Sequence, residues 1–337
     1  MRILVIGGSG LIGRQLVPHL LAEGHDVVVL SRGNRGIEAS GARHVLGDRR
    51  DPAAVRKAAQ GTFDALIDNV AYVPEDAESV LGALEGRIGH YVLTSTAFVY
   101  SALGARELGP SAALREQDAP PASLTALVQD DSPHGRYVQG KRLLERSLLE
   151  DCLERGLPLT IVRPAPQIMG PYTEDGRFAW FWLRTADGGP IWLPMEARVH
   201  AGPCQVAYSG DVARILAAAA ARPPRTYAVH NAAQPELWSY EEYLGLMAEI
   251  LGRQADVRYA TRDALDRSPF AVEGVYRLPL PYRVALDVSS VADRLAFAWT
   301  PMRTWMARTG DWVGRYYEGR QEPWYRLRSE EVAWPGP

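Results

Sequence analysis

The chain has 337 residues, 47% of them apolar and 23% charged, and a formal net charge of −3. This composition predicts a globular protein with a large core and one to three domains, and the slightly acidic balance argues against nucleic acid as a partner. Two cysteines, Cys152 and Cys204, predict free thiols, and no apolar run is long enough for a membrane span, so we expect a cytoplasmic protein without a membrane segment.

Short β-branched runs alternate with helical patterns in the first half of the chain. The expected strands are 2–8, 26–32, 42–48, 64–72, 90–98 and 159–165, and the expected helices between them include 11–24, 51–60 and 75–86. Near-continuous apolar strands separated by helices indicate a parallel sheet that is covered on both faces. The predicted fold class is therefore α/β, a Rossmann-type doubly wound parallel sheet with a smaller, irregular C-terminal substrate domain.

The rhythm of strands and helices breaks after Pro164. We expect a dinucleotide-binding domain at 1–165 with a return segment at about 205–232, a substrate domain at 166–204 and 233–317, and a C-terminal tail at 318–337. Within the second domain, 239–252 has the pattern of an amphipathic helix, with Ser239 as its cap and Glu242 three residues on.

Glycines follow the first expected strand at Gly7, Gly10 and Gly13. Glycine lets a backbone turn tightly and approach a pyrophosphate, which then lies at the positive end of the next helix. Such a triplet also occurs as a plain turn, but its place between a strand and a helix favours a dinucleotide. Leu11 and Ile12, inside the same loop, are further candidate contacts.

The second expected strand ends in "LSRGNR", with Ser31, Arg32 and Arg35 and no acid before Glu38. An acid at this place holds the ribose of NAD, whereas arginine suits the 2′-phosphate of NADP. The sequence therefore favours NADP over NAD, which stays possible, since arginine is the ordinary cation of this chain and these residues could simply lie on the surface.

Lysine occurs only at Lys57 and Lys141, in a chain rich in arginine. On a helix, Tyr137 and Lys141 lie on one stripe with Leu144 and Leu148. A nearby ammonium favours the phenolate of a tyrosine, and a compact cation can reach ribose hydroxyls where the planar fork of arginine cannot. An exposed helix cation is the alternative, but it would not explain the choice of lysine.

The glycine spacing and the Tyr-x-x-x-Lys motif resemble the extended short-chain dehydrogenase/reductase superfamily (NAD-dependent epimerase/dehydratase family). The segments "GDRRD", "PYTEDGRFAWFWLR" and "HGRYVQGKR" also resemble a subgroup related to chloroplast stem-loop RNA-binding proteins. The resemblance implies that Thr96, rather than its neighbour Ser95, orients the substrate oxygen beside Tyr137 and Lys141. It implies further cofactor contacts by Asp48, Arg49, Asn69, Val70, Ala71, Thr94, Lys141 and Pro164.

The substrate side departs from the family's sugar-nucleotide enzymes. Gln167 stands where an Asn is usual, and Asp211 lacks the arginine that precedes it in the family, although Arg177 or Arg198 could substitute. Residues 101–133 form an expected insertion over the active site, from which Glu116 and Asp118 could reach the substrate, as could His134 just beyond it; solvated loop positions are the alternative. No metal site is predicted, because His200 and Cys204 lack a partner pair.

An aromatic group in the second domain could wall a pocket or form the domain core; its members are Trp180, Phe181, Trp182 and Trp192. We expect an NAD(P)-dependent enzyme that transfers hydride to or from a secondary alcohol or ketone of a sugar nucleotide or specialised metabolite, with dehydration disfavoured because Ala97 and Phe98 follow Thr96. An RNA-binding or non-catalytic relative is the alternative. The resemblance implies a homodimer through the Tyr137 helix, which Leu143, Leu149 and Leu153 could line.

Overall fold

The computed structural model describes residues 1–33, 41–103, 113–174, 176–195, 205–270, 285–320, 322 and 324–337. These residues form two compact units, each treated by itself below. Unit 1 comprises Met1–Ile168, Ala207–Ala233 and Leu286–Trp299, and unit 2 comprises Met169–Val206, Gln234–Ala285 and Thr300–Pro337.

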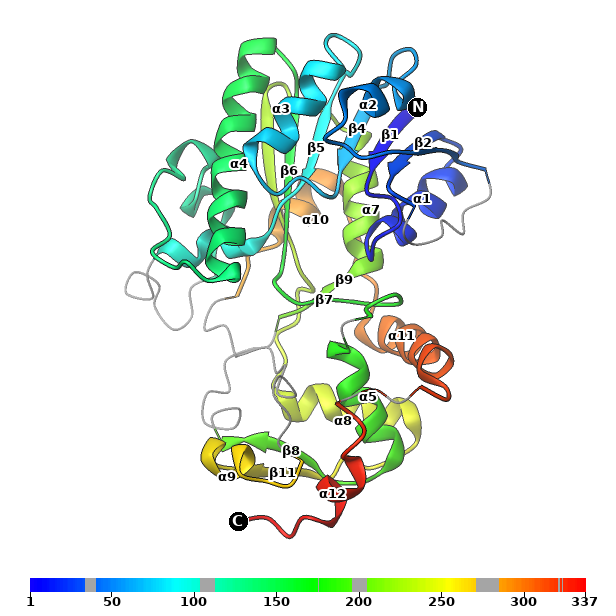
Figure 1. Cartoon of the computed structure of the whole chain (residues 1–337), viewed down its shortest axis with the longest axis vertical. Helices are drawn as coiled ribbons and strands as arrows, with labels where there is room; N and C mark the ends of the chain where they lie inside the picture. The colour runs from blue at the N-terminus through cyan, green and yellow to red at the C-terminus, as the bar shows by residue number, and fades with distance from the viewer. Residues whose placement is uncertain are drawn as a thin grey trace. The chain divides into compact units, whose positions relative to one another are not determined.

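A seven-stranded parallel sheet forms the centre of unit 1 (Figure 1). Its order is β10-β6-β5-β4-β1-β2-β3, with β1 Arg2–Ile6, β2 Asp26–Ser31, β3 Arg43–Leu46, β4 Ala65–Asp68, β5 Tyr91–Thr94, β6 Leu159–Pro164 and β10 Tyr227–Ala232. The central strands are buried on both faces, as a doubly wound sheet requires. The predicted fold class is confirmed.

Helices cover both faces of this sheet. One layer is α2 (Pro52–Ala58), α3 (Pro74–Ala83) and α4 (Pro133–Arg155), whose apolar side chains share one core cluster with the strands; the other is α1 (Gly13–Ala22) and α7 (Ser209–Ala220). Helix α4 begins at Pro133 because the Ser132 hydroxyl accepts a hydrogen bond from the Gly135 amide, and it ends where Gly156 turns left-handed at φ 62°.

The remaining described elements of unit 1 are short. They are the 3₁₀ helices η1 (Ala97–Leu103), η2 (Glu116–Asp118) and η3 (Pro121–Ser123), the helix α10 (Ser289–Leu295), and β9 (Ala207–Tyr208), which pairs with β7 (Ile168–Met169).

Segment 286–299, expected in the second domain, belongs to unit 1. The Asp287 amide donates to the Leu114 carbonyl at 2.9 Å, and the side-chain amide of Asn231 on β10 donates to the carbonyls of both residues. Helix α10 then packs on β10. The sequence does not reveal this assignment, because these contacts join residues far apart in the chain.

Unit 2 is built from α5 (Arg177–Asp187), α8 (Tyr240–Leu251) and α11 (Met302–Tyr317), with the parallel pair β8 (Ile191–Pro194) and β11 (Val257–Ala260) and the short helices α9 (Arg262–Asp266) and α12 (Arg328–Ala333). The predicted capping box of α8 is confirmed: the Glu242 amide donates to the Ser239 hydroxyl at 3.2 Å, and the Ser239 amide donates to the Glu242 carboxylate at 2.8 Å.

Aromatic side chains and the C-terminal segment close the core of unit 2. Phe178 stacks on Trp182 with ring centroids 5.5 Å apart, and all four members of the expected aromatic group are buried, so core is the role they have here. The end of the chain is no loose tail, because Glu331 of α12 forms a buried ion pair with Arg184 of α5 at 2.8 Å.

Leu149 does not lie where the expected dimer interface needs it. Its side chain is buried in the sheet-side core of unit 1, whereas Leu143 and Leu153 are exposed on the same helix. Leu149 is therefore removed from the interface residues proposed for α4.

Candidate active site

The glycine loop joins β1 to α1 in the conformation that its residues require. Gly7 has φ +87° and its amide donates to the Leu30 carbonyl at 3.0 Å, which ties the loop to β2. A Cβ on Gly13 would lie 2.4 Å from the Gly7 carbonyl oxygen, so only glycine allows the helix to start this close to the loop. A Cβ on Gly10 would meet nothing within 4 Å.

Gly10 therefore faces open space, and that space is a pocket. Its volume is about 520 Å³, and it is lined by the glycine loop, by the ends of β1 and β2, and by the loops that follow β3 and β4; the members are Ile6, Gly7, Ser9, Gly10, Leu30, Ser31, Arg32, Gly47, Asp48, Arg49, Arg50, Val70, Tyr72 and Asp76. It lies at the carboxyl ends of parallel strands, where doubly wound sheets bind ligands. The glycines and the helix start fit the phosphates of a dinucleotide.

The end of β2 contributes Ser31 and Arg32 to this pocket. The Ser31 hydroxyl contacts His44 Nε2 at 2.8 Å and accepts from the Gly33 amide at 3.3 Å, while Arg32 is exposed. Arg35 lies outside the described residues. Asp48 lines the pocket with its carboxylate accepting from the Arg50 amide at 2.9 Å.

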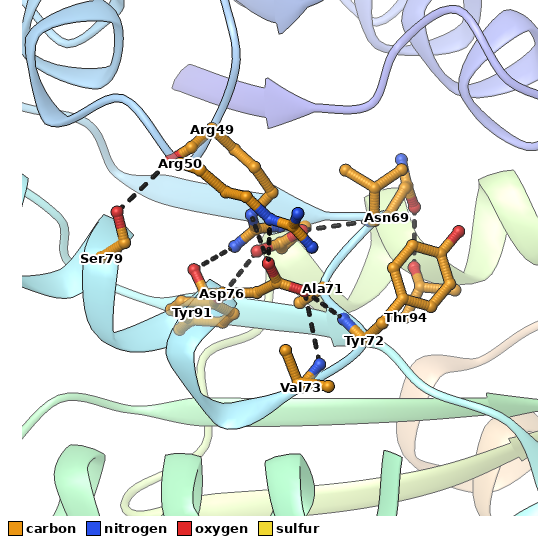
Figure 2. A network of polar contacts seen from close by, with 12 residues as sticks. Arg49, Arg50, Asn69, Ala71, Tyr72, Val73, Asp76, Ser79, Tyr91 and Thr94 are labelled. Carbon is orange, nitrogen blue, oxygen red and sulfur yellow. Dashed lines mark hydrogen bonds and ion pairs between the residues drawn. The ribbon is translucent and has the colours of Figure 1, made fainter. Parts of the chain in front are cut away.

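Arg49 turns its guanidinium away from solvent and into the edge of the sheet (Figure 2). It donates to the Asp68 carboxylate at 2.5 Å and to the Asp76 carbonyl at 2.5 Å. Asp68, at the end of β4, also accepts from the Tyr91 hydroxyl at 2.6 Å and the Val70 amide at 3.1 Å. Arg49 and these hydrogen bonds hold the pKa of Asp68 below its ordinary value against the effect of burial.

The loop after β4 carries the expected contacts Asn69, Val70 and Ala71. Asn69 Oδ1 accepts from the Thr94 hydroxyl at 2.7 Å, which joins the ends of β4 and β5. Val70 packs against Gly7, since a Cβ there would lie 2.6 Å from Val70 Cγ1. The loop thus lies directly beside the glycine loop.

Lys141 reaches this loop from α4. Its side chain is 2% exposed, and its ammonium donates to the carbonyls of Ala71 at 2.6 Å and Thr94 at 2.8 Å. An ammonium has three donors, so these two bonds leave one for a bound molecule. Burial lowers the pKa of Lys141 to about 8, and Asp68 is the group that most opposes this fall.

Tyr137 lies one turn before Lys141 on the same helix and contacts Thr96. Burial raises the pKa of the phenol, and its hydrogen bond with Thr96 acts in the opposite direction. The influences on this pKa are burial, Thr96 and Tyr72, and the Lys141 ammonium donates to the two backbone carbonyls. The structure thus brings together Thr96 and Tyr137, with Lys141 one helical turn further on; Ser95 is buried beside Thr96.

The other expected cofactor contacts lie at the same edge of the sheet. Pro164 ends β6, opposite Ala232 of β10, and Leu11 and Ile12 lie half-buried at the start of α1. Sequence reasoning missed Asp68, Tyr72 and Asp76. The available signal was the run "ALIDNV", in which an acid stands at the end of a strand that is otherwise apolar.

The described part of the insertion contains the short helices η2 and η3, followed by an irregular segment, 125–131, whose side chains are mostly exposed; Asp118 and His134 are exposed too, whereas Glu116 is half-buried. The Glu116 carboxylate accepts from the Asn231 amide at 2.8 Å, and Asp118 accepts from the Arg115 amide at 2.7 Å. Beneath them, fully buried Arg163 pairs with Glu145 of α4 and donates to the Tyr100 hydroxyl at 2.9 Å and the Ala119 carbonyl at 2.8 Å. One guanidinium therefore joins β6, α4, η1 and the insertion.

The described residues hold no group of three or more His, Cys, Asp or Glu side chains arranged for a metal ion. Arg198, His200 and Cys204 lie outside them, and Cys152 is a buried free thiol. No described helix is long and apolar enough to cross a membrane.

Known proteins share this fold and parts of this sequence. A stem-loop binding protein of 41 kDa from the chloroplast of Arabidopsis thaliana is 28% identical over 209 residues, which cover 57% of this chain and 49% of that protein; the match spans about half of its length. UDP-glucose 4-epimerase from Thermotoga maritima, solved with UDP-glucose, has a TM-score of 0.71 at 17% identity, over 94% of this chain and 99% of that one. The enzyme of the same name from Thermus thermophilus, solved with NAD, has a TM-score of 0.67 at 22% identity, over 93% and 99%.

The two structural likenesses agree with the Rossmann-type sheet, and the resemblance seen in the motifs has its counterpart in a family model. The model for the NAD dependent epimerase/dehydratase family matches residues 3–230, a span that contains the glycine loop, Thr96, Tyr137 and Lys141. The chain therefore belongs to the NAD dependent epimerase/dehydratase family.

Proposed function

We propose that the protein is a nicotinamide-dinucleotide-dependent oxidoreductase or epimerase that moves a hydride to or from a secondary alcohol or ketone. The observation that carries the proposal is the contact between Thr96 and Tyr137, one helical turn from buried Lys141. Thr96 follows the end of β5, and Tyr137 and Lys141 lie on α4; the glycine loop follows β1 at the same carboxyl end of the parallel sheet.

The chain's own residues have separate tasks in this scheme. Thr96 orients the reacting oxygen, and the Tyr137 hydroxyl gives or takes its proton. Lys141 holds the ribose with its remaining donor and contributes positive charge to the site. When bound, the nicotinamide supplies the hydride acceptor or donor at C4. Burial raises the pKa of Tyr137, and positive charge nearby would favour its phenolate.

The proposed substrate is a nucleotide-linked sugar or a related specialised metabolite. Its support is the likeness of fold to two UDP-glucose 4-epimerases, at identities that speak for the fold alone. A screen of UDP- and dTDP-sugars, followed by the change in cofactor absorbance at 340 nm or by product epimer analysis, tests this class.

NADP is the proposed preference, with NAD as the alternative that the Thermus thermophilus complex supports. Arg32 lines the pocket next to Ser31. The sequence has no acid after the end of β2 until Glu38. We expect NADPH to bind more tightly than NADH, and Arg32→Ala to weaken NADPH alone. Equal affinities, or tighter NADH binding, would reverse the preference.

Tyr137→Phe is the decisive variant for the enzymatic proposal. We expect it to abolish turnover while dinucleotide affinity stays within about twofold, because the hydroxyl acts on the substrate and not on the cofactor. Tyr227→Phe, at the start of β10 and half exposed, removes the same atom far from this edge and serves as the control. Turnover that survives in Tyr137→Phe would contradict the proposal.

RNA binding is the second candidate, favoured by the chloroplast stem-loop binding relative. In that case the protein should bind stem-loop RNA with an affinity that falls steeply with salt, and Tyr137→Phe should leave that affinity unchanged. Binding without turnover on any nucleotide sugar would support this reading over the first.

A homodimer through α4 is proposed with the two leucines that the helix exposes, Leu143 and Leu153. Light scattering of the wild type against Leu153→Glu tests it: a dimer that becomes a monomer supports the interface, and a monomeric wild type removes it.

A further inference from the structure

Lys141 donates a hydrogen bond to a five-residue loop, 69–73, that two buried carboxylates hold in place. On the β4 side, Asp68 accepts from the Val70 amide at 3.1 Å. On the α3 side, Asp76 accepts from the amides of Tyr72 at 2.8 Å and Val73 at 3.3 Å. Figure 2 shows the Asp76 carboxylate directed at the amides of Tyr72 and Val73. The Ala71 carbonyl of the same loop accepts from the Lys141 ammonium at 2.6 Å.

Arg49 connects the two ends of that arrangement. It pairs with the Asp68 carboxylate and donates to the carbonyl of Asp76, and its side chain is buried together with those of both acids. Two buried carboxylates with one buried guanidinium carry one uncompensated negative charge. Lys141, buried beside the same loop, supplies the second positive charge and brings the group to neutrality.

The other nearby charges are already paired elsewhere or face solvent. Glu145, one turn after Lys141 on α4, is held by the fully buried Arg163 at 2.5 Å. Arg50 lies 3.4 Å from the Asp76 carboxylate, but its side chain is 73% exposed, so water screens that pair. Asp68 and Arg49 are therefore the buried charged pair that we expect to act most directly on Lys141.

We propose that Asp68 and Arg49 are positioning residues for Lys141: Asp68 supplies a buried negative charge and binds the loop 69–73, whose Ala71 carbonyl accepts from the lysine, and Arg49 holds Asp68 and Asp76 at the two ends of that loop. Asp48, which lines the dinucleotide pocket, directly precedes Arg49. The same short segment thus contacts the pocket with one side chain and supports the catalytic lysine with the next.

The charged and titratable groups that act on Lys141 come from every element around it. Burial is the largest influence and lowers its pKa, Asp68 raises it most, and weaker influences follow from Glu145 and Asp76, which raise it, and from Arg49, which lowers it. The rings of Tyr72 and Tyr137 lie with their centroids 6.1 Å apart, and the ammonium lies 4.9 Å from the centre of the Tyr72 ring. Removing the charge of Asp68 should therefore lower the pKa of Lys141, and removing the charge of Arg49 should raise it.

The chain is well suited to a direct measurement, since it has only two lysines. A sample labelled with ¹³C at the lysine Cε gives two side-chain signals, and Lys57→Arg assigns them by removing one. Titration of the chemical shift then reads the ionisation of Lys141 without substrate or dinucleotide. The proposal rests on the proposed function only for the role of Lys141, and this readout stays valid if that function fails.

We expect a midpoint near 8 for Lys141 in the wild type. Asp68→Asn should move it to lower pH by about one unit or more, since an opposite charge near the ammonium is lost. Arg49→Met should move it to higher pH. Asp26→Asn changes the net charge equally at an exposed site at the start of β2 and should leave the midpoint in place.

A midpoint for Lys141 that Asp68→Asn leaves unchanged, or one that moves in the same direction in Asp68→Asn and Arg49→Met, overturns the proposal. Circular dichroism establishes that each variant is folded. If Asp68→Asn does not fold, Asp76→Asn replaces it, with a smaller shift to lower pH expected, and the requirement of opposite signs against Arg49→Met decides in the same way.

Discussion

Two glycines of one loop should fail in different ways when each is replaced by alanine. In Gly13→Ala the new methyl would lie 2.4 to 2.6 Å from backbone atoms of Gly7 and Gly8, which cannot move aside as a side chain would. The loop or the start of α1 must shift, and we expect a loss of about 2–4 kcal/mol in the free energy of unfolding. In Gly10→Ala the methyl meets no protein atom within 4 Å, so stability should change by less than about 0.5 kcal/mol.

We predict that the dinucleotide occupies the open space at Gly10, so the same methyl that costs no stability should block binding. We expect affinity for NAD(P)H to fall at least about tenfold, equal to 1.4 kcal/mol of binding free energy. Urea unfolding followed by far-UV circular dichroism measures stability, because this signal includes the helices and strands of unit 1, whereas tryptophan fluorescence would report mainly on unit 2, which holds eight of the nine tryptophans. Cofactor fluorescence measures affinity.

Gly10→Ala that binds the dinucleotide like the wild type would refute the placement of the pyrophosphate at this loop. A Gly13→Ala protein as stable as the wild type would refute the steric reasoning. The pair is its own control, since the substitution is the same and only the surroundings differ.

Three further expectations concern stability. His90 and His230 are buried, and burial lowers the pKa of each to about 4. Below pH 6.5 the folded state therefore binds fewer protons than the unfolded state, so the free energy of unfolding should fall between pH 6.5 and 4, by about 2.5 kcal/mol for each histidine at pH 4.5. Urea titrations at several pH values measure this dependence on pH, which His90→Gln should reduce. Glu145→Gln leaves the Arg163 charge buried and should cost about 3–5 kcal/mol in the same assay, whereas a neutral effect would mean that water reaches the guanidinium. Gly82→Ala, exposed within α3 with open space around it, should raise stability by about 0.5–1 kcal/mol; a loss would show that the helix is not formed there.

The features that the sequence predicts well depend on the spacing of residues that lie close together in the chain. The sheet follows from apolar runs long enough to be buried on both faces, and the capping box of α8 from Ser239 and Glu242, three residues apart. Tyr137 and Lys141 share a stripe on α4 because four residues make about one helical turn. Each of these needs only the chain within a few residues of itself.

The features missed depend on partners that sequence spacing does not reveal. The action of Lys141 on Tyr137 stays a prediction; what the sequence did not reveal are its two acceptors, backbone carbonyls 70 and 47 residues away, because every residue has such a carbonyl. Arg49 lines the pocket, and its guanidinium also pairs with an acid 19 residues on, a partner that the sequence did not reveal. Leu149 was placed at an interface because a helix with apolar residues on several sides does not show which side the sheet covers.

The ion pair between Arg184 and Glu331 joins residues 147 apart, and the three parts of unit 1 end only at Trp299. During synthesis on the ribosome, the core around α5 therefore waits for α12, and until Glu331 emerges its ion pair with Arg184 cannot form. Such late, non-local closure slows folding and lengthens the time in which apolar surface is exposed. Translation that stalls before Arg328 would leave unit 2 open to chaperones and proteases.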